Sequence, residues 1–188
     1  MCKGEKTERI STKELVRLSR AGRRDAFDEL VRLYQRQAME VAIRILGDAN
    51  EAAEAVQNSF VKAFLNITKL KKPEKFETWL LRIMVNESVS RIRKTKLKEK
   101  TVKSGEYFDE SKSLSDEQNE SAAEMKEAIQ KAMQKLSNKE AEAISLFGFQ
   151  DLPHKEVAEI MDCTVESARW YVYSARKKLK VLLKEYLE

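Results

Sequence analysis

The segment from Leu152 to Leu179 combines an apolar stripe with a row of long cationic and aromatic side chains. Ala168, Val172, Ala175 and Leu179 recur at helical spacing, which predicts one buried face. The opposite face carries side chains that can reach base edges or phosphates, namely Glu166, Arg169, Trp170, Tyr173, Lys177 and Lys180. Such a helix fits a DNA major groove, which is about 12 Å wide. A helical hairpin with a solvated basic face would show the same pattern.

The residues before this helix predict a helix-turn-helix. A first helix from about Pro153 to Met161 is followed by a turn at Asp162-Cys163-Thr164 and then by the second helix. In DNA-binding proteins of this type the second helix enters the groove and the first one supports it.

Residue types needed for catalysis are scarce. His154 is the sole histidine, and no acidic or thiol cluster surrounds it in the sequence. No glycine-rich phosphate loop, G-x-S-x-G or C-x-x-C motif occurs, so we expect no catalytic residues, no metal and no cofactor. Cys2 and Cys163 lie far apart, which favours free thiols in a reducing, intracellular setting.

A second candidate binding region is the lysine-rich connector from Lys69 to Lys75, next to a helix carrying Trp79, Asn86, Ser90 and Arg91. Cationic loops beside aromatic and amide groups suit single-stranded nucleic acid, because lysines follow phosphates while pockets hold unstacked bases. The alternatives are a solvated connector, a core role for Trp79 and a buried amide at Asn86.

The composition predicts an all-α protein. Only two prolines and five glycines occur among 188 residues, and no alternation typical of strands persists. The charged fraction is 36% and the net charge only +5, which excludes a histone-like polycation but allows local cationic patches. Because no long apolar run is present, we expect a soluble, cytoplasmic protein without direct membrane insertion.

Helical periodicity divides the chain into two bundles. Helices are predicted over about 12–20, from after Gly22 to 46, over 50–67 and over 76–94, the last apolar nearly all round at its start. Residues rich in Ser, Asp and Glu then indicate a flexible linker. A helix restarts near Met125, and Ser137 to Glu140 fits a capping box. The predicted layout is a bundle over 10–95, a linker over 96–123 and a helix-turn-helix domain over 124–188.

Three long segments together resemble the extracytoplasmic-function (ECF) group of the sigma-70 family of RNA polymerase sigma factors. They are ELVRLSRAGRRDAFDELVRLYQRQAMEVAIRILGDANEAAEAVQNSFVKAF, KFETWLLRIMVNESVSRIRK and LSNKEAEAISLFGFQDLPHKEVAEIMDCTVESARWYVYSARKKL. Coverage is about nine-tenths of the chain, and order and spacing agree. The resemblance implies binding to core RNA polymerase and to promoter DNA, and it allows an anti-sigma partner held between the two domains.

The resemblance also implies three sets of site residues. The core-polymerase-binding set is Asp48, Glu51, Glu54, Gln57 and Asn58. The set for the single-stranded minus-ten element is Lys69, Lys71, Lys72, Lys75, Phe76, Asn86, Ser90, Arg91, Arg93 and Lys94. The set for the duplex minus-thirty-five element is Thr164, Val165, Glu166, Ser167, Arg169, Trp170, Tyr173, Arg176 and Lys177.

Several residues depart from the family pattern. Ala53 and Asn58 stand where acids are common, which predicts weaker or altered polymerase contacts. Pro153 replaces a Ser or Thr cap, so Asp151 is the expected alternative cap. Glu166 and Trp170 replace small residues, which leaves the promoter sequence open. A ligand-sensing repressor, which would bind duplex DNA alone, and a helical adaptor without DNA contact are the rival classes.

Overall fold

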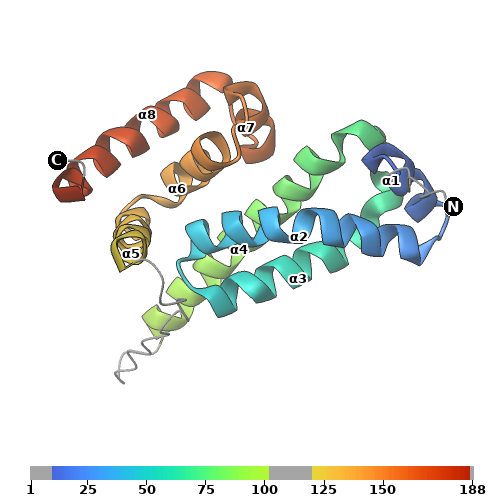
Figure 1. Cartoon of the computed structure of the whole chain (residues 1–188), viewed down its shortest axis with the longest axis horizontal. Coiled ribbons are helices and arrows are strands. Elements are labelled where there is room, and N and C mark those ends of the chain that lie inside the picture. Colours follow the sequence, from blue (N-terminus) through green and yellow to red (C-terminus); the bar gives the residue numbers. More distant parts are fainter. Residues whose placement is uncertain (1–9, 102–119, 187–188) are drawn as a thin grey trace, which may run out of the picture.

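The described part of the chain is helical throughout its regular structure, as predicted (Figure 1). The computed structural model describes residues 10–101 and 120–186, with side chains described for 10–94, 124–184 and 186. Within these ranges eight α-helices and four short helical turns occur, and no strand does. Over the same ranges, none of the helices combines the length and apolarity that crossing a bilayer requires. Cys2 lies outside the described residues.

The first four helices form the N-terminal bundle: α1 Thr12–Arg20, α2 Arg24–Leu46, α3 Ala49–Asn66 and α4 Phe76–Thr101. Their ends follow local chemistry. The Ser11 hydroxyl accepts a hydrogen bond from the backbone N–H of Glu14, and the Asp48 carboxylate accepts one from that of Glu51 at 2.7 Å. Between α2 and α3, Gly47 adopts the left-handed conformation with φ 77°, which ends α2.

The connector between α3 and α4 is built from two short 3₁₀ turns, η1 Ile67–Lys69 and η2 Pro73–Lys75. Buried Leu70 lies between them, and buried Phe76 follows, so apolar side chains fix the connector to the bundle at two points. The backbone that carries the connector lysines is therefore held in place by the bundle.

Helix α4 is the buried centre of the bundle, as the sequence predicts. Phe76, Leu80, Leu81, Met84 and Val85 are all buried. The helix runs to Thr101 and not to the predicted Lys94, because the intervening lysines, glutamate and leucine are good helix formers and no glycine or proline interrupts them.

The C-terminal half contains α5 Glu120–Gln134, α6 Asn138–Ile144, the π-helical turn η3 Ser145–Phe149, α7 His154–Met161, α8 Val165–Leu182 and the 3₁₀ turn η4 Lys184–Tyr186. The predicted capping box at α6 is present, with Ser137 and Glu140 exchanging backbone and side-chain hydrogen bonds. Helices α4 and α5 extend into both ends of the predicted linker, 96–123, and its middle, 102–119, lies outside the described residues.

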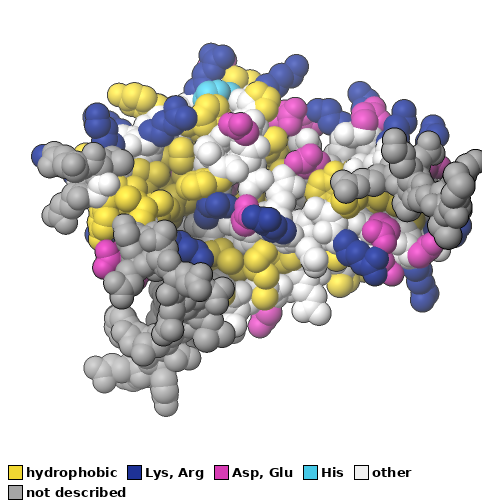
Figure 2. Space-filling view, in the orientation of Figure 1, with side chains coloured by type: hydrophobic (Ala, Val, Ile, Leu, Met, Phe, Trp, Pro, Cys, Tyr) yellow, Lys and Arg dark blue, Asp and Glu magenta, His cyan; other side chains and the backbone are white. Residues whose placement is uncertain are grey.

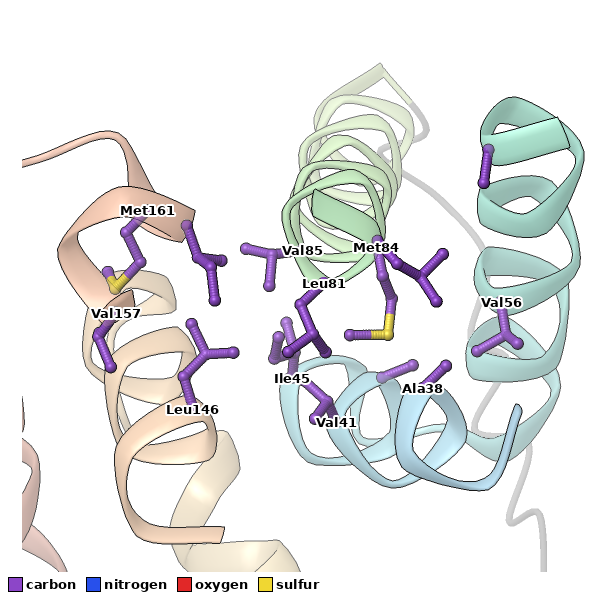
Figure 3. Packing of buried hydrophobic residues seen from close by; sticks show 14 of the residues in the cluster. Ala38, Val41, Ile45, Val56, Leu81, Met84, Val85, Leu146, Val157 and Met161 are labelled. Carbon is purple, nitrogen blue, oxygen red and sulfur yellow. The ribbon is translucent and has the colours of Figure 1, made fainter. Parts of the chain in front are cut away.

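The two halves pack together through a continuous apolar core (Figure 3). Val85 of α4 points toward the side of Met161 of α7, while Leu81 of α4 lies beside Ile45 of α2, across from Leu146. The two halves therefore share a buried core, which the predicted layout of two bundles joined by a flexible linker does not include. Both halves carry more apolar side chains than either can bury alone, and burying them against each other is favourable.

Candidate nucleic-acid interface

The turn between α7 and α8 has the geometry of a helix-turn-helix. Asp162 ends α7 in the left-handed conformation with φ 53°, and the backbone N–H of Cys163 donates to the carbonyl oxygen of Ala158 at 3.1 Å. The Thr164 hydroxyl then caps α8 by accepting from the N–H of Ser167 at 3.1 Å. Cys163 is a free, partly buried thiol whose pKa is raised by burial.

The start of α7 differs from expectation. Pro153 itself occupies the N-cap position, without any side-chain cap, and Asp151 does not cap the helix. Asp151 lies instead in the left-handed region with φ 55°, a conformation that Asp tolerates better than most residues, and this turns the chain into the helix.

Helix α8 presents an exposed face beside a narrow buried one. Ala168, Val172 and Ala175 are buried, whereas the side chains of Trp170 and Tyr173 are 60% and 65% exposed. Other predicted minus-thirty-five residues on the exposed side are Thr164, Glu166, Arg169, Arg176 and Lys177, while Val165 and Ser167 are half-buried. Figure 2 shows Lys and Arg side chains with hydrophobic ones between them along the edge formed by α8.

Trp170 packs mainly on its own helix. Its ring meets that of Tyr171 edge-on, with centroids 5.3 Å apart, and most of its surface stays open. Arg176 is partly held, because its guanidinium lies over the ring of Phe147 at 4.8 Å from the centroid. An exposed aromatic pair beside cations gives α8 a face suited to apolar and ionic contacts with DNA.

Glu140 of α6 fixes the position of α8. Its buried carboxylate accepts hydrogen bonds from the Ser174 hydroxyl at 2.6 Å and from the Lys178 ammonium at 2.8 Å, both on α8. Burial by itself would raise the pKa of Glu140, but the bonds from Lys178, Ser174 and Ser137 outweigh burial and lower the pKa to about 2. Sequence reasoning found Glu140 as a cap only, since spacing does not reveal which helix a buried acid faces.

The predicted polymerase-binding residues lie on the outer side of α3. Glu51, Glu54, Gln57 and Asn58 are exposed, and Ala52, Val56 and Phe60 on the other side are buried. Asp48 is half-buried and serves as the cap of α3. Beside Ala53 and Gln57, the apolar side chains of Phe27, Val31 and Phe64 line a shallow groove between α2 and α3.

Arg91 joins two of the predicted surfaces. Its Nε donates to the Glu51 carboxylate at 2.9 Å, and its Nη2 donates to the Glu54 carboxylate. The Arg91 side chain is only 14% exposed as a result. Arg91, a predicted DNA-binding residue of α4, thus pairs with two predicted polymerase-binding residues of α3. Because these residues lie far apart in the sequence, the sequence alone did not indicate the contact.

Polar residues follow one face of α4. Asn86, Ser90 and Arg93 recur at spacings of four and three, with Lys94 beside them, so they share a side of the helix. Asn86, Arg93 and Lys94 are exposed and Ser90 is half-buried. The exposure of Asn86 excludes the alternative of a buried amide. Trp79, two turns before Asn86, is half-buried and packs against the core, in line with the core alternative for this residue.

The structure does not support Phe76 as a member of the predicted minus-ten set. It is fully buried, and its ring centroid lies 5.4 Å from that of Tyr34 and 6.0 Å from that of Trp79. A ring with no exposed surface cannot contact a base in this arrangement. Its apolar bulk at the start of α4 is better stabilised by the core than by solvent.

The connector lysines differ in their partners. Lys71 and Lys72 are exposed, and Lys69 donates to the Asn66 side-chain oxygen at 2.7 Å. Lys75 pairs with Glu159 of α7 at 3.4 Å, so one predicted DNA contact is engaged by the other half of the chain. Within the described residues, no group of three or more His, Cys, Asp or Glu side chains is placed to hold a metal ion.

Comparison with known proteins identifies both halves. The model for Sigma-70 region 2 matches residues 30–97, and the model for Sigma-70, region 4 matches residues 126–179. The RNA polymerase sigma-H factor of Pseudomonas aeruginosa is 29% identical over 184 residues, covering 92% of this chain and 95% of that protein. The ECF RNA polymerase sigma factor SigW of Bacillus subtilis is 28% identical over 181 residues, covering 92% and 97%.

Solved structures share the fold over most of the chain. CnrH in complex with the cytosolic domain of CnrY superimposes with a TM-score of 0.70 at 20% identity, covering 93% of this chain and 97% of that one. The sigma factor RpoE of Bartonella quintana, in complex with the anti-sigma factor NepR, gives a TM-score of 0.66 at 24% identity, covering 84% and 96%.

The chain therefore belongs to the sigma-70 family of RNA polymerase sigma factors, in its ECF group. Members of this family are transcription initiation factors that direct RNA polymerase to promoters. The predicted family and the all-helical architecture are both confirmed.

Proposed function

We propose that this chain binds core RNA polymerase in the cytoplasm, directs it to specific promoters and helps to open the minus-ten element. The observation that carries the proposal is the presence of two different exposed faces, a polar and cationic one on α4 and a cationic and aromatic one on α8, in a chain that matches sigma region 2 and region 4. One face suits unpaired bases and the other suits a duplex groove.

The acid and amide face of α3 is the proposed polymerase contact. Glu51, Glu54, Gln57 and Asn58 offer carboxylates and amides to a cationic partner surface, on a helix that buried alanines and aromatics hold in place. The apolar groove beside Gln57 would add contact area to this polar face. Exposed charges alone contribute little affinity, so apolar contact is needed for a stable complex.

The polar face of α4 is the proposed minus-ten site. Asn86 can form paired hydrogen bonds with an unpaired base, and Arg93 and Lys94 on the same face can bind the neighbouring phosphates. Unstacking a base costs a few kcal/mol, which only a complementary pocket recovers. The lysines at 69, 71, 72 and 75 would follow the strand along the connector.

Arg91 can join this site only after its present bonds change. In the free chain Glu51 and Glu54 hold it, so a strand phosphate must compete with two carboxylates. Cationic groups of the polymerase, on binding these carboxylates, would release Arg91 towards DNA. Polymerase binding and strand capture are then energetically linked, and linkage of this kind is reciprocal.

Helix α8 is the proposed reader of the minus-thirty-five duplex. Arg169 can donate two hydrogen bonds to guanine, and Glu166 can accept one from a cytosine amino group. Trp170 and Tyr173 offer apolar surface to thymine methyl groups, while Arg176 and Lys177 bind phosphates and set the register.

We also propose control by an anti-sigma protein, because the two similar solved structures named above are sigma factors in complex with such proteins. An inhibitor wedged between the two halves would have to separate α4 from α7, which pack together here. A peptide wrapped over the closed chain needs no such separation.

Reconstitution tests the proposed function. The purified chain is mixed with core RNA polymerase, and binding is measured by fluorescence anisotropy, followed by transcription from genomic fragments. We expect binding below micromolar concentration and transcripts that core enzyme alone does not make. Tight binding to duplex DNA without polymerase, together with no core binding, would favour a repressor.

A further inference from the structure

A pocket lies between the C-terminal part of α2, helix α5 and the turn η3. Its volume is about 370 Å³, and Figure 1 shows α5 beside the end of α2 that forms one of the walls. None of the residues predicted to bind polymerase or DNA lines this pocket. Pockets of about 300 Å³ and above commonly hold small molecules. The pocket is therefore a candidate ligand site that is separate from the surfaces described above.

Apolar side chains form most of the pocket wall. They are Ile43 of α2, Met125, Ile129 and Met133 of α5, and Phe149 of η3. Met133 is buried, whereas Phe149 is 40% exposed, so the wall runs from the core to the surface. A hydrocarbon chain that covers this wall releases water from apolar surface, which is favourable.

Arg44 places a positive charge in this apolar wall. Its side chain is only 26% exposed, and burial lowers the pKa of its guanidinium group. The Nη1 atom is buried and has no hydrogen-bond acceptor among the described residues. The guanidinium lies over the ring of Phe149, 4.0 Å from the centroid. A ring face replaces only part of the hydration that burial removes, so an anion in the pocket would be strongly attracted to this group.

Glu40 also lines the pocket, but it does not supply the missing hydrogen bond. Its Oε2 lies 3.9 Å from Nη1 of Arg44, which is too far, and its Oε1 accepts from Nε of Arg36 at 3.1 Å. On the α5 side, exposed Lys126 adds a second positive charge. The ionisable groups that line the pocket, Arg44, Lys126 and Glu40, therefore carry one net positive charge, which favours an anionic ligand.

We propose that this pocket binds a small aliphatic carboxylic acid, with the hydrocarbon chain against Ile43, Met133 and Phe149 and the carboxylate paired with Arg44. The apolar wall selects the chain, and the partly buried guanidinium selects the acid group, because a carboxylate matches its planar donors. A single small acid suits the volume of the pocket better than a length of peptide does. The site goes beyond the proposed sigma-factor function and does not depend on it.

The probe is sodium octanoate, titrated into the full chain with ¹³C-labelled methionine methyl groups. Six methionines occur in the sequence, of which Met125 and Met133 line the pocket, while Met84 and Met161 are buried in the core and report on folding. Single Met→Leu variants assign the signals. We expect the Met125 and Met133 signals to shift and to saturate with a dissociation constant below about 1 mM, while the Met84 and Met161 signals stay in place.

Octanol and octylamine separate the two parts of the proposed recognition. Octanol keeps the apolar chain and loses the ion pair, so it should bind about tenfold more weakly than octanoate. Octylamine brings a positive charge to a pocket that already carries one, so it should bind more weakly still.

Three variants test the charges of the pocket. Arg44→Gln should weaken octanoate binding about tenfold, to the level of octanol, whereas Glu40→Gln removes a repelling carboxylate and should tighten it about twofold to fivefold. The matched control is Arg32→Gln on the same helix, where the side chain is 70% exposed and pairs only with Glu29. It should leave octanoate binding within about twofold.

Four results would overturn the proposal. They are the absence of shifts at Met125 and Met133, octanol binding as tight as octanoate binding, unchanged binding in Arg44→Gln, and shifts caused by an acidic peptide but not by octanoate. The last result would assign the pocket to a protein partner. If Arg44→Gln does not fold, the comparison with octanol and the Glu40→Gln variant still decide. None of these measurements involves polymerase, so a failure of this site leaves the proposed function untouched.

Discussion

At the scale of single residues, Arg169 carries the clearest expectation. Its side chain is exposed on α8 and forms no ion pair with any of the described residues, so its donors are available for a base. Arg169→Ala should reduce use of the minus-thirty-five element by about 1–3 kcal/mol, which is roughly fivefold to 150-fold. Transcription from promoters with intact and scrambled upstream elements measures this loss. Arg36→Ala on α2, where the side chain is exposed and pairs only with Glu40, is the control and should change little.

Arg91 offers a test of linkage between the two proposed surfaces of region 2. The double variant Glu51→Gln/Glu54→Gln frees Arg91, so the isolated chain should bind a single-stranded minus-ten oligonucleotide severalfold tighter at low salt. The same variant should bind core polymerase more weakly. Anisotropy titrations with each partner measure both effects, and a fall in both affinities would contradict the linkage.

Asn86 tests the proposed base capture. Asn86→Ala removes an exposed amide and leaves the packing of α4 intact, so folding and core binding should not change. Strand opening should slow by about tenfold, because one base loses its hydrogen bonds. Permanganate footprinting of unpaired thymines measures opening. Normal opening kinetics would remove Asn86 from the site.

The sequence predicted the exposure of most candidate residues but not their partners. On α3 and α8 the apolar spacing fixes which side faces outward, so Glu54 and Tyr173 were placed correctly. Phe76 was wrongly predicted to contact DNA, and it is buried in the core. An aromatic residue beside lysines is compatible with base stacking and also with the buried first turn of a helix. The pairing of Arg91 with Glu51 and Glu54 could not be predicted, because α3 and α4 come together only when the chain folds.

At the scale of helices, Glu140 and Glu142 on α6 should respond to pH in opposite ways. Glu140 has a pKa lowered to about 2, so it contributes stability at pH above its unfolded value near 4.5 and loses it as the pH falls towards 2. The shift corresponds to about 3 kcal/mol. Glu140→Gln should therefore destabilise the chain by about 2–3 kcal/mol at pH 7 and much less at pH 3, as measured by urea unfolding.

Glu142, two residues further, is the matched comparison. Burial raises the pKa of Glu142 despite the nearby Lys139, so its charged form opposes folding at neutral pH. Glu142→Gln should be neutral or stabilising by about 1 kcal/mol at pH 7, because it removes a buried charge and leaves Lys139 partly exposed to water. Equal destabilisation by both variants would show that their hydrogen bonds, and not their charges, matter.

Helix ends were largely predictable, whereas helix lengths beyond the bundles were not. Ser11, Asp48, Gly47 and Ser137 act at the ends where their chemistry places them. The extension of α4 to Thr101 was missed, because a charged segment without an apolar stripe carries no periodic signal even where most of its residues favour a helix.

At the scale of the whole molecule, the all-round apolar start of α4 indicated more than one buried side. One side packs against α2 and α3, and the other, with Val85, is covered by the C-terminal half. The sequence could assign this surface to a core but could not say which elements would complete it. For that reason the two halves were predicted as separate bundles, and their shared core was not foreseen.

The central claim is that this chain gives core RNA polymerase its promoter specificity. The most direct measurement is transcription of sheared genomic DNA from the source organism by core enzyme with and without the chain, with sequencing of RNA 5′ ends. The account predicts a set of new start sites that share one sequence motif about 10 and another about 35 base pairs upstream. Identical start sites with and without the chain, although it is folded and present in excess, would contradict it.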